Sequence, residues 1–254
     1  MNGGLTSKIF AYCERGLDPA FWAEPLNAVS NAGFFIAAAV AAVAMVRTRA
    51  VGQPRWSEWA LIGLVGVIGT GSFLFHTLAT RWAAIADGAP IAIFMLAYTG
   101  YALRRFLGLS RWASALGLAA FVAALAAASA APCPLALRSL VKGVGCPNGS
   151  LGYGPALVTL ALVAAAAAVK RHPAAGYLIA ASAAFAVSLV MRSLDQEVCG
   201  ATMVWGQTRG THALWHLLNA VTLGVLLMAA VRYGDVAGTS SRGPLDFSRP
   251  RVVG

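Results

Sequence analysis

The chain has 254 residues, of which 59% are hydrophobic and only 11% are charged, and its mean hydropathy is +0.71. A soluble domain of this length does not need so much apolar sequence for one core, so the composition predicts a membrane protein. The net charge is +10, but the basic residues form no patch with interleaved aromatic residues, which argues against nucleic-acid binding. In a membrane protein, excess Arg and Lys is a topology signal.

Seven apolar segments are long enough to cross a membrane as helices, which takes roughly 20 residues each. They lack the alternation of strands, and backbone exposed to lipid must form helices or closed barrels. The expected spans are 25–46, 59–78, 87–103, 112–131, 151–169, 173–191 and 212–231. The sequence therefore predicts an all-α bundle of seven transmembrane helices.

The expected organisation is an external N-terminal segment at 1–24, a transmembrane domain at 25–233 and a flexible cytoplasmic tail at 234–254. Residues 1–24 contain three acidic side chains and lack the apolar stretch of a cleavable signal peptide, so the first span is expected to be an uncleaved anchor. The tail is polar and contains Gly, Ser and Pro, which is typical of a mobile terminus.

The positive charges predict the orientation of the bundle. Of the 19 Lys and Arg residues, twelve lie on the C-terminal side of the predicted spans and seven on the N-terminal side, which favours an external N-terminus and a cytoplasmic C-terminus. All four cysteines fall on the N-terminal side, as expected in an oxidising compartment. Three pairings of four cysteines are possible, and their spacing does not rank them.

Three of the four histidines lie at the N-terminal-side ends of the predicted helices. Ser72 and His76 end the second span, spaced i, i+4 on one helix face. His212 and His216 begin the seventh span with the same spacing, and Asp87 is expected to begin the third. Ionisable groups inside a membrane domain are costly and are functional candidates by default. We expect these five side chains to converge at one depth.

Three nitrogen ligands and an open fourth position are typical of catalytic rather than structural zinc, and no cysteine lies at this depth. The alternative is that the histidines hydrogen-bond to neighbouring helices. In that case Asp87 would be a helix N-cap, and Ser72 would bond a carbonyl of its own helix. An i, i+4 pair with a third histidine favours metal binding, because intramembrane histidines are rare without a function.

Five segments resemble the alkaline ceramidase family, which belongs to a superfamily of seven-span hydrolases that includes the adiponectin receptors. They are YCER (12–15), FWAEPLNAVSN (21–31), GSFLFH (71–76), DGAP (87–90) and HALWHLLNA (212–220). The eleven-residue spacing from His76 to Asp87 and the HxxxH that opens the last span also agree. The resemblance covers the whole chain in order.

The resemblance implies a zinc-dependent amidase that cleaves ceramide to a sphingoid base and a fatty acid. His76, His212 and His216 would hold Zn²⁺, Asp87 would orient or deprotonate the attacking water, and Ser72 would donate a hydrogen bond to the oxyanion. Such a donor contributes about 3–4 kcal/mol. The expected partners are membrane lipids and a ceramide-like substrate entering from the lipid, and no protein partner is implied.

The resemblance also implies a Ca²⁺ site in the N-terminal segment, with Glu14, Glu24 and the backbone carbonyl of Tyr12 as ligands. Two family ligands are replaced by Ala11 and Gly16, and calcium prefers six to eight oxygen ligands. Losing two ligands is expected to weaken the site.

For Glu14 and Glu24, the alternative to calcium is ion pairing with Arg15 or Arg209.

The resemblance further suggests a disulfide between Cys13 and Cys199, which would leave Cys133 and Cys146 as a second pair. Asp195, in the motif RSLD before the seventh span, also matches the family and is expected to brace the metal ligands.

Other classes of function are weighed against the amidase. A seven-helix lipid receptor or sensor with a structural zinc and little turnover would show the same residues, and turnover separates the two. An ion carrier needs polar groups through the full thickness, which the fifth and sixth spans lack. A retinal protein needs a lysine within a span, and all three lysines lie outside. The Arg-rich, Lys-poor composition indicates a bacterial inner (plasma) membrane protein.

Overall fold

A computed structural model of the chain describes residues 4–48, 55–133, 147–204 and 206–234. Within these residues, seven helical spans are long and apolar enough to cross a membrane. They are α1 (Pro25–Ser30) with α2 (Ala32–Arg47), α3 (Trp56–Leu78), α4 (Arg81–Arg105), α5 (Arg111–Ala130), η1 (Ser150–Tyr153) with α7 (Gly154–Val169), α8 (Ala175–Leu194) and α9 (His212–Tyr233). This confirms the all-α, seven-span fold of a multi-pass membrane protein.

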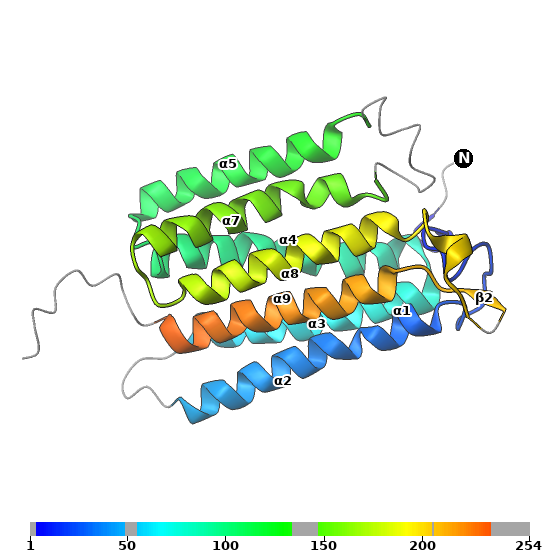
Figure 1. The fold of residues 1–254 in the computed structure, drawn as a ribbon, viewed down its shortest axis with the longest axis horizontal. Helices are drawn as coiled ribbons and strands as arrows, with labels where there is room; N and C mark the ends of the chain where they lie inside the picture. The colour runs from blue at the N-terminus through cyan, green and yellow to red at the C-terminus, as the bar shows by residue number, and fades with distance from the viewer. Residues whose placement is uncertain (1–3, 49–54, 134–146, 205, 235–254) are drawn as a thin grey trace, which may run out of the picture.

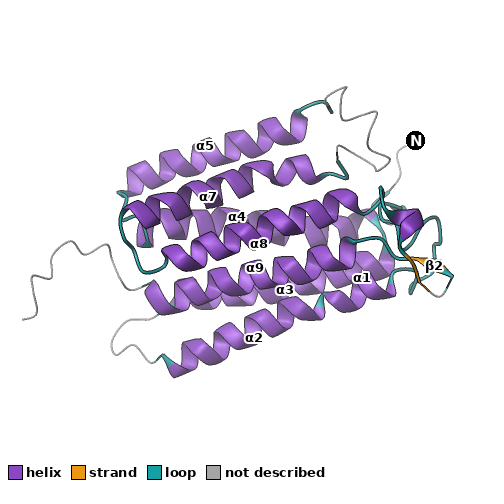
Figure 2. Ribbon diagram, viewed as in Figure 1, coloured by secondary structure: helices purple, strands orange, loops and turns teal. Residues whose placement is uncertain are grey.

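The spans pack side by side along the long axis of the molecule (Figures 1 and 2). Each described span contacts the next one in the sequence, and α9 packs back against α2, which closes the bundle. Helices α3 and α9 are the most buried of the seven. Side chains that these two helices direct inward are therefore far from both lipid and water.

A short connection between α8 and α9 contains the 3-10 helix η2 (Cys199–Ala201) and an antiparallel pair of strands, β1 (Met203–Val204) and β2 (Gln207–Thr208). It lies at the same end of the bundle as residues 4–24 (Figure 1). We call this the N-terminal end. Which side of the membrane it faces stays a prediction.

The N-terminal segment is fastened across this end. The backbone N–H of Ile9 donates to the carbonyl of Ala79, just after α3. A disulfide joins Cys13 to Cys199, which confirms the first expected pair. Cys146 lies outside the described residues, so its expected disulfide with Cys133 stays a prediction. The expected tail after Gly234 also lies outside them and stays a prediction.

The start of the third span differs from the prediction, because α4 begins at Arg81 and Asp87 lies nearly two turns inside it. Asp87 is therefore not an N-cap. Pro90 has no N–H, so the carbonyl of Ala86, four residues earlier, lacks its usual helical donor. That carbonyl faces α3 at Gly71, where a Cβ would lie only 1.9 Å from the carbonyl oxygen.

This contact generates a prediction about Gly71. Gly71→Ala places a methyl group against the α4 backbone, and overpacking of this kind lowers stability by about 1–3 kcal/mol. Gly66, on the same helix, has open space where its Cβ would be, so Gly66→Ala is the matched control. We expect a lower thermal unfolding temperature in detergent for the first variant only, and equal temperatures would contradict the close approach.

Candidate metal centre

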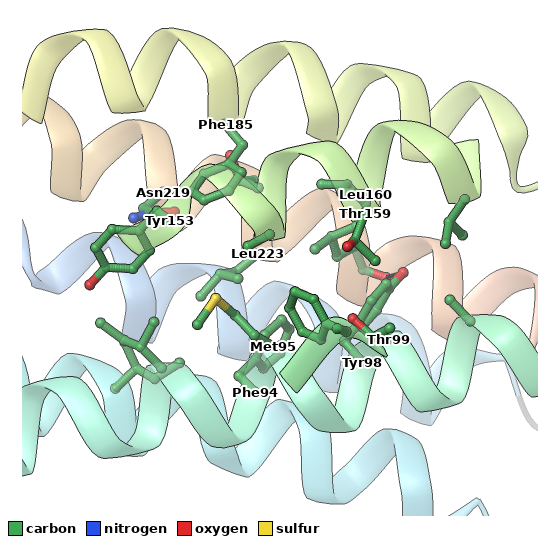
Figure 3. A pocket seen from close by; sticks show the side chains of 18 of the residues that line it. Phe94, Met95, Tyr98, Thr99, Tyr153, Thr159, Leu160, Phe185, Asn219 and Leu223 are labelled. Atoms are coloured by element: carbon green, nitrogen blue, oxygen red, sulfur yellow. Dashed lines mark hydrogen bonds between the residues drawn. The ribbon is translucent and has the colours of Figure 1, made fainter. Parts of the chain in front are cut away.

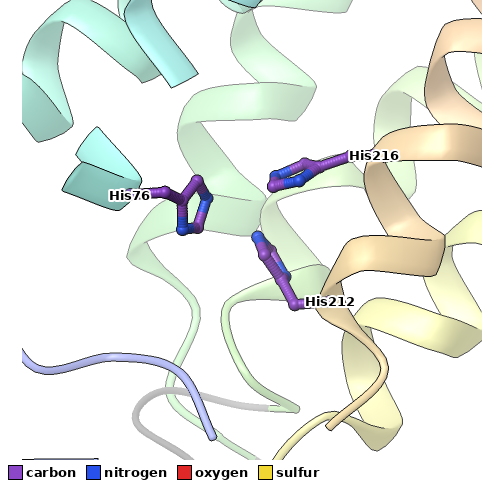
Figure 4. A group of neighbouring side chains, drawn as sticks. All are labelled: His76, His212 and His216. Carbon is purple, nitrogen blue, oxygen red and sulfur yellow. The ribbon is translucent and has the colours of Figure 1, made fainter. Parts of the chain in front are cut away.

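The three predicted histidines converge at the N-terminal end of the bundle (Figure 4). His76 comes from the last turn of α3, and His212 and His216 come from the first turns of α9. All three are buried, and each offers a ring nitrogen within 4.8 Å of the other two. The i, i+4 spacing in α9 places its two rings on one face, opposite the ring from α3.

Hydrogen bonds fix which nitrogens of two rings face the centre. Nδ1 of His76 is hydrogen-bonded to the Glu24 carboxylate, which only accepts. Nδ1 of His216 lies 2.8 Å from Ser30 Oγ, and this hydroxyl already donates to the Asn27 carbonyl. Both Nδ1 atoms therefore carry the proton, and both Nε2 atoms present a lone pair.

The ring nitrogens that face the centre could bind a metal ion. Nε2 of His76 and Nδ1 of His212 are fully buried and have no hydrogen-bond partner among the described residues. Buried polar nitrogens without a partner are costly. A carboxylate on the far nitrogen of a histidine is also the usual support of a metal-bound imidazole. The donor set is three neutral imidazoles, which suits zinc.

The His212 ring makes no hydrogen bond to a described residue and is oriented by packing instead. Tyr12 stacks on it with 3.7 Å between ring centroids. Burial raises the pKa of the Tyr12 hydroxyl to about 12, so this group stays protonated. Tyr12 was expected to offer its carbonyl to calcium, which stays a prediction; that carbonyl accepts the backbone N–H of Gly16 at 3.2 Å.

Ser72 and Asp87 lie beside the histidines, as the sequence predicts. Ser72 is one turn before His76, and its hydroxyl lies 3.4 Å from Nε2 of His216. The Asp87 carboxyl lies close to Ser72. Because Gly71 brings α4 against α3, the carboxylate approaches the histidines from within α4 rather than from a helix start.

Glu24 and Arg15 connect the centre to the N-terminal segment. Arg15 is buried and donates from Nε to Glu24 and from Nη2 to the His76 carbonyl at 2.8 Å. Burial disfavours the Glu24 carboxylate, but its hydrogen bonds to His76, Arg15 and Asn27 outweigh this and hold its pKa below the usual value. Glu24 therefore stays charged and keeps the His76 ring in position.

Glu14 is also paired. Its carboxylate accepts the N–H groups of Leu26 and Asn27 at the start of α1, and Arg209 lies 3.0 Å away. The alternative proposed for the two glutamates, ion pairing with Arg15 and Arg209, is thus present in the structure. The calcium site stays a prediction.

Asp195 supports the start of α9. It accepts backbone N–H groups from Cys13 at 3.0 Å and from Thr211 and His212 at 2.9 Å each. Burial raises the pKa of Asp195 despite these three hydrogen bonds. Gly210 makes room for the carboxylate, since its φ is +66° and a Cβ would lie 2.1 Å from Oδ1. Asp195 thus fixes the backbone that carries His212.

An apolar cavity lies inside the bundle next to the histidines (Figure 3). All seven spans line it, and it encloses about 760 Å³ of space free of protein atoms, counted out to its open side. Phe34 and Asn219 border it near His216, and its lining on α4 runs from Ile91 to Ala102. At 1.5 Å per residue this is roughly 16 Å, about half of the hydrocarbon layer.

Several residues of the site were not assigned from the sequence. Glu24 was expected at a calcium ion rather than at His76, and Ser30 was not considered. Their signal is the run of polar residues in FWAEPLNAVSN (21–31), which faces the histidines from an otherwise apolar span. The cavity has no sequence signal, because its lining comes from all seven spans.

The fold and the site define a class of protein: a multi-pass membrane protein whose two most buried helices carry a three-histidine centre above an apolar cavity. A family model described as Ceramidase matches residues 5–242. The chain therefore belongs to the ceramidase family, which confirms the resemblance seen in the sequence. No curated protein matches the chain. The family match supports hydrolysis of ceramide as the general reaction.

The hydrogen bond between Glu24 and His76 generates a prediction. Glu24→Gln removes the charge that orients the ring, and the loss of such a partner typically costs 10–100-fold in metal affinity. Zinc affinity is measured by competition with a chelator. Asp18→Asn is the matched control, because Asp18 is an exposed acid of the same segment. Equal zinc affinity of the Gln variant and the unmodified protein would contradict the role of Glu24.

Proposed function

We propose that the protein is a zinc-dependent intramembrane amidase that hydrolyses ceramide or a related N-acyl lipid to a free fatty acid and a sphingoid-type amine. The observation that carries this proposal is the convergence of three buried imidazoles, two of which have a buried ring nitrogen without a partner among the described residues. Membership of the ceramidase family supports the same reaction. The serine and aspartate beside the imidazoles supply the remaining polar groups that amide hydrolysis needs.

His76, His212 and His216 would hold the zinc ion. When bound, zinc supplies a Lewis acid that polarises the carbonyl and lowers the pKa of water to about 7. Three protein ligands leave one coordination position open. The chain's own contribution is to fix the three rings through Glu24, Ser30 and the stacked Tyr12.

Asp87 would transfer protons, and Ser72 would stabilise the oxyanion. The Asp87 carboxylate would take a proton from the attacking water and deliver it to the leaving nitrogen. Ser72 lies close to Asp87. Once Asp87 is protonated it can donate to Ser72 Oγ, and the serine O–H is then free to point at the oxyanion of the tetrahedral intermediate.

The cavity would take one apolar chain of the substrate. Its wall of aromatic and aliphatic side chains runs along the bundle below His216, so a chain lying there places the adjoining amide near the histidines. The second chain of a two-chain lipid would stay in the membrane. The disulfide at the N-terminal end favours an external, oxidising location of the site.

Turnover of the purified protein tests the proposal. Ceramide and other N-acyl lipids are incubated with the zinc-loaded protein, and release of fatty acid is followed by mass spectrometry. His216→Ala is expected to lose both the stoichiometric zinc and the activity, since two imidazoles hold zinc poorly. A variant that keeps one equivalent of zinc by elemental analysis contradicts the ligand set. A zinc-loaded protein that binds these lipids without releasing acid points instead to the receptor alternative.

Ser72→Ala separates the oxyanion role from metal binding. The variant is expected to keep one equivalent of zinc and to lower kcat by about 10²–10³, the usual cost of one oxyanion donor. Ser182→Ala, in the first half of α8, is the matched control, because its hydroxyl donates to the Leu178 carbonyl of its own helix. An unchanged rate for Ser72→Ala would remove its role at the oxyanion.

A further inference from the structure

Arg192 is a partly buried cation that the proposed mechanism does not use. It lies in the last turn of α8, at the N-terminal end of the bundle. Its guanidinium carbon lies over three aromatic rings, 5.8 Å from the centroid of Tyr12, 5.3 Å from Tyr153 and 5.2 Å from Trp215. Since Tyr12 stacks on His212, one ring separates this cation from the metal centre.

This guanidinium has no anionic partner among the described residues. Within the described part of the chain, its side chain makes one hydrogen bond, from Nη1 to the Tyr12 hydroxyl at 3.3 Å, and Nε is buried without a partner. Charged groups in membrane domains normally pair with an opposite charge or with backbone carbonyls. Aromatic faces attract the cation, but they leave its N–H donors unused.

The nearest candidate counter-charge within the protein is Asp87, and it does not form an ion pair with Arg192 in the described part of the chain. Asp87 lies close to Ser72, and it interacts with Arg192 only through longer-range electrostatics. The Tyr12 hydroxyl is neutral at physiological pH. The described residues therefore leave this positive charge beside the histidines with N–H donors that they do not use.

The position of Arg192 suits a ligand that extends into the cavity. Tyr153, which underlies the guanidinium, also lines the cavity, and it lies near Asn219 in Figure 3. Trp215, the third ring of the cage, directly precedes the metal-binding candidate His216 in α9. A lipid with its chain in the cavity would therefore bring its polar end close to both Arg192 and the histidines.

We propose that Arg192 forms a carboxylate-binding subsite beside the metal centre. The planar guanidinium is suited to two parallel N–H···O bonds with a carboxylate. This inference rests on the proposed amidase function and deepens it. The carboxylate has two possible sources: the fatty acid released by the reaction, or an acidic head on the amine half of the substrate.

The released acid supplies a carboxylate in a balanced reaction. Hydrolysis breaks the C–N bond, and the water oxygen joins the acyl carbon. Both water protons end on the nitrogen side, which gives a carboxylate and an ammonium group. Arg192 would then receive the carboxylate and make the product a competitive inhibitor.

The test compares ligands that differ only in charge. Binding of a long-chain fatty acid and of its methyl ester to the zinc-loaded protein is measured by equilibrium dialysis in detergent. The acid-over-ester affinity ratio is expected to fall about tenfold or more in Arg192→Met, because hydrogen bonds to charged groups are lost. Arg111→Met, an exposed arginine at the start of α5, is the control and keeps the ratio. Zinc content is measured for every variant.

A second arm distinguishes the two sources. N-acyl amino acids and their methyl esters are compared as ligands of the same variants. Loss of acid preference in the free fatty acid series assigns the subsite to the product, and loss in the N-acyl amino acid series assigns it to the substrate head. An unchanged preference in both series, with zinc retained, overturns the proposal.

Arg192→Lys decides the outcome if the Met variant does not retain zinc. It keeps the charge but not the fork of donors, so a ratio reduced at least threefold supports the proposal and an unreduced ratio overturns it. The amidase proposal fails separately: if the unmodified protein releases no acid from any N-acyl lipid, an Arg192-dependent acid preference still establishes the carboxylate subsite.

Discussion

A membrane interior makes every unpaired ionisable side chain costly, and this constraint organises the N-terminal end of the bundle. One carboxylate, Glu24, gives several buried polar groups a hydrogen-bond partner at once, because it bonds Arg15, Asn27 and His76. Arg15 also donates to the carbonyl of His76 at the end of α3. The ring of a candidate metal ligand is therefore held by a segment outside the spans, which the disulfide and Asp195 fasten to the bundle.

The opposite end of the bundle shows that a buried carboxylate alone does not mark a functional site. Glu58 is as buried as His76. It accepts hydrogen bonds from the hydroxyls of Tyr101 at 2.7 Å and Ser57 at 2.8 Å, and Arg55 lies 3.7 Å away. Both of its oxygens are satisfied by the protein, so this cluster ties α3 to α4. The N-terminal end differs because two of its buried imidazole nitrogens, Nε2 of His76 and Nδ1 of His212, have no hydrogen-bond partner among the described residues.

The sequence was informative where the signal is local. Length and apolarity predict the spans, and i, i+4 spacing predicts the paired histidines. The start of α4 was predicted wrongly, because Gly88 and Pro90 after Asp87 are typical of a helix start. The helix instead begins at Arg81, and the carbonyl that Pro90 leaves without its helical donor lies against Gly71 of another helix. That close approach is tertiary and cannot be read from α4 alone.

The sequence likewise does not predict which partners the buried side chains of the site bind. Arg15 and His76 are both chemically reasonable partners of Glu24, and only the packing of α1 on α3 brings both to its carboxylate. The cavity and the aromatic cage around Arg192 combine side chains from several helices, so no single segment carries their signature. The family resemblance, by contrast, was recognisable because its motifs contain the histidines themselves.

The charges of the site explain why it suits a reaction that creates an anion. Three neutral imidazoles would leave the charge of a divalent zinc ion uncompensated, and Glu24 is already balanced by Arg15. The negative charge of Asp87 would offset only part of the zinc charge, and Arg192 adds a further positive charge nearby. In a medium of low dielectric constant such an excess strongly favours any ligand that develops negative charge. The oxyanion and then the carboxylate of amide hydrolysis are such ligands, whereas the uncharged amide gains much less, so the arrangement favours the later species along the reaction over the substrate.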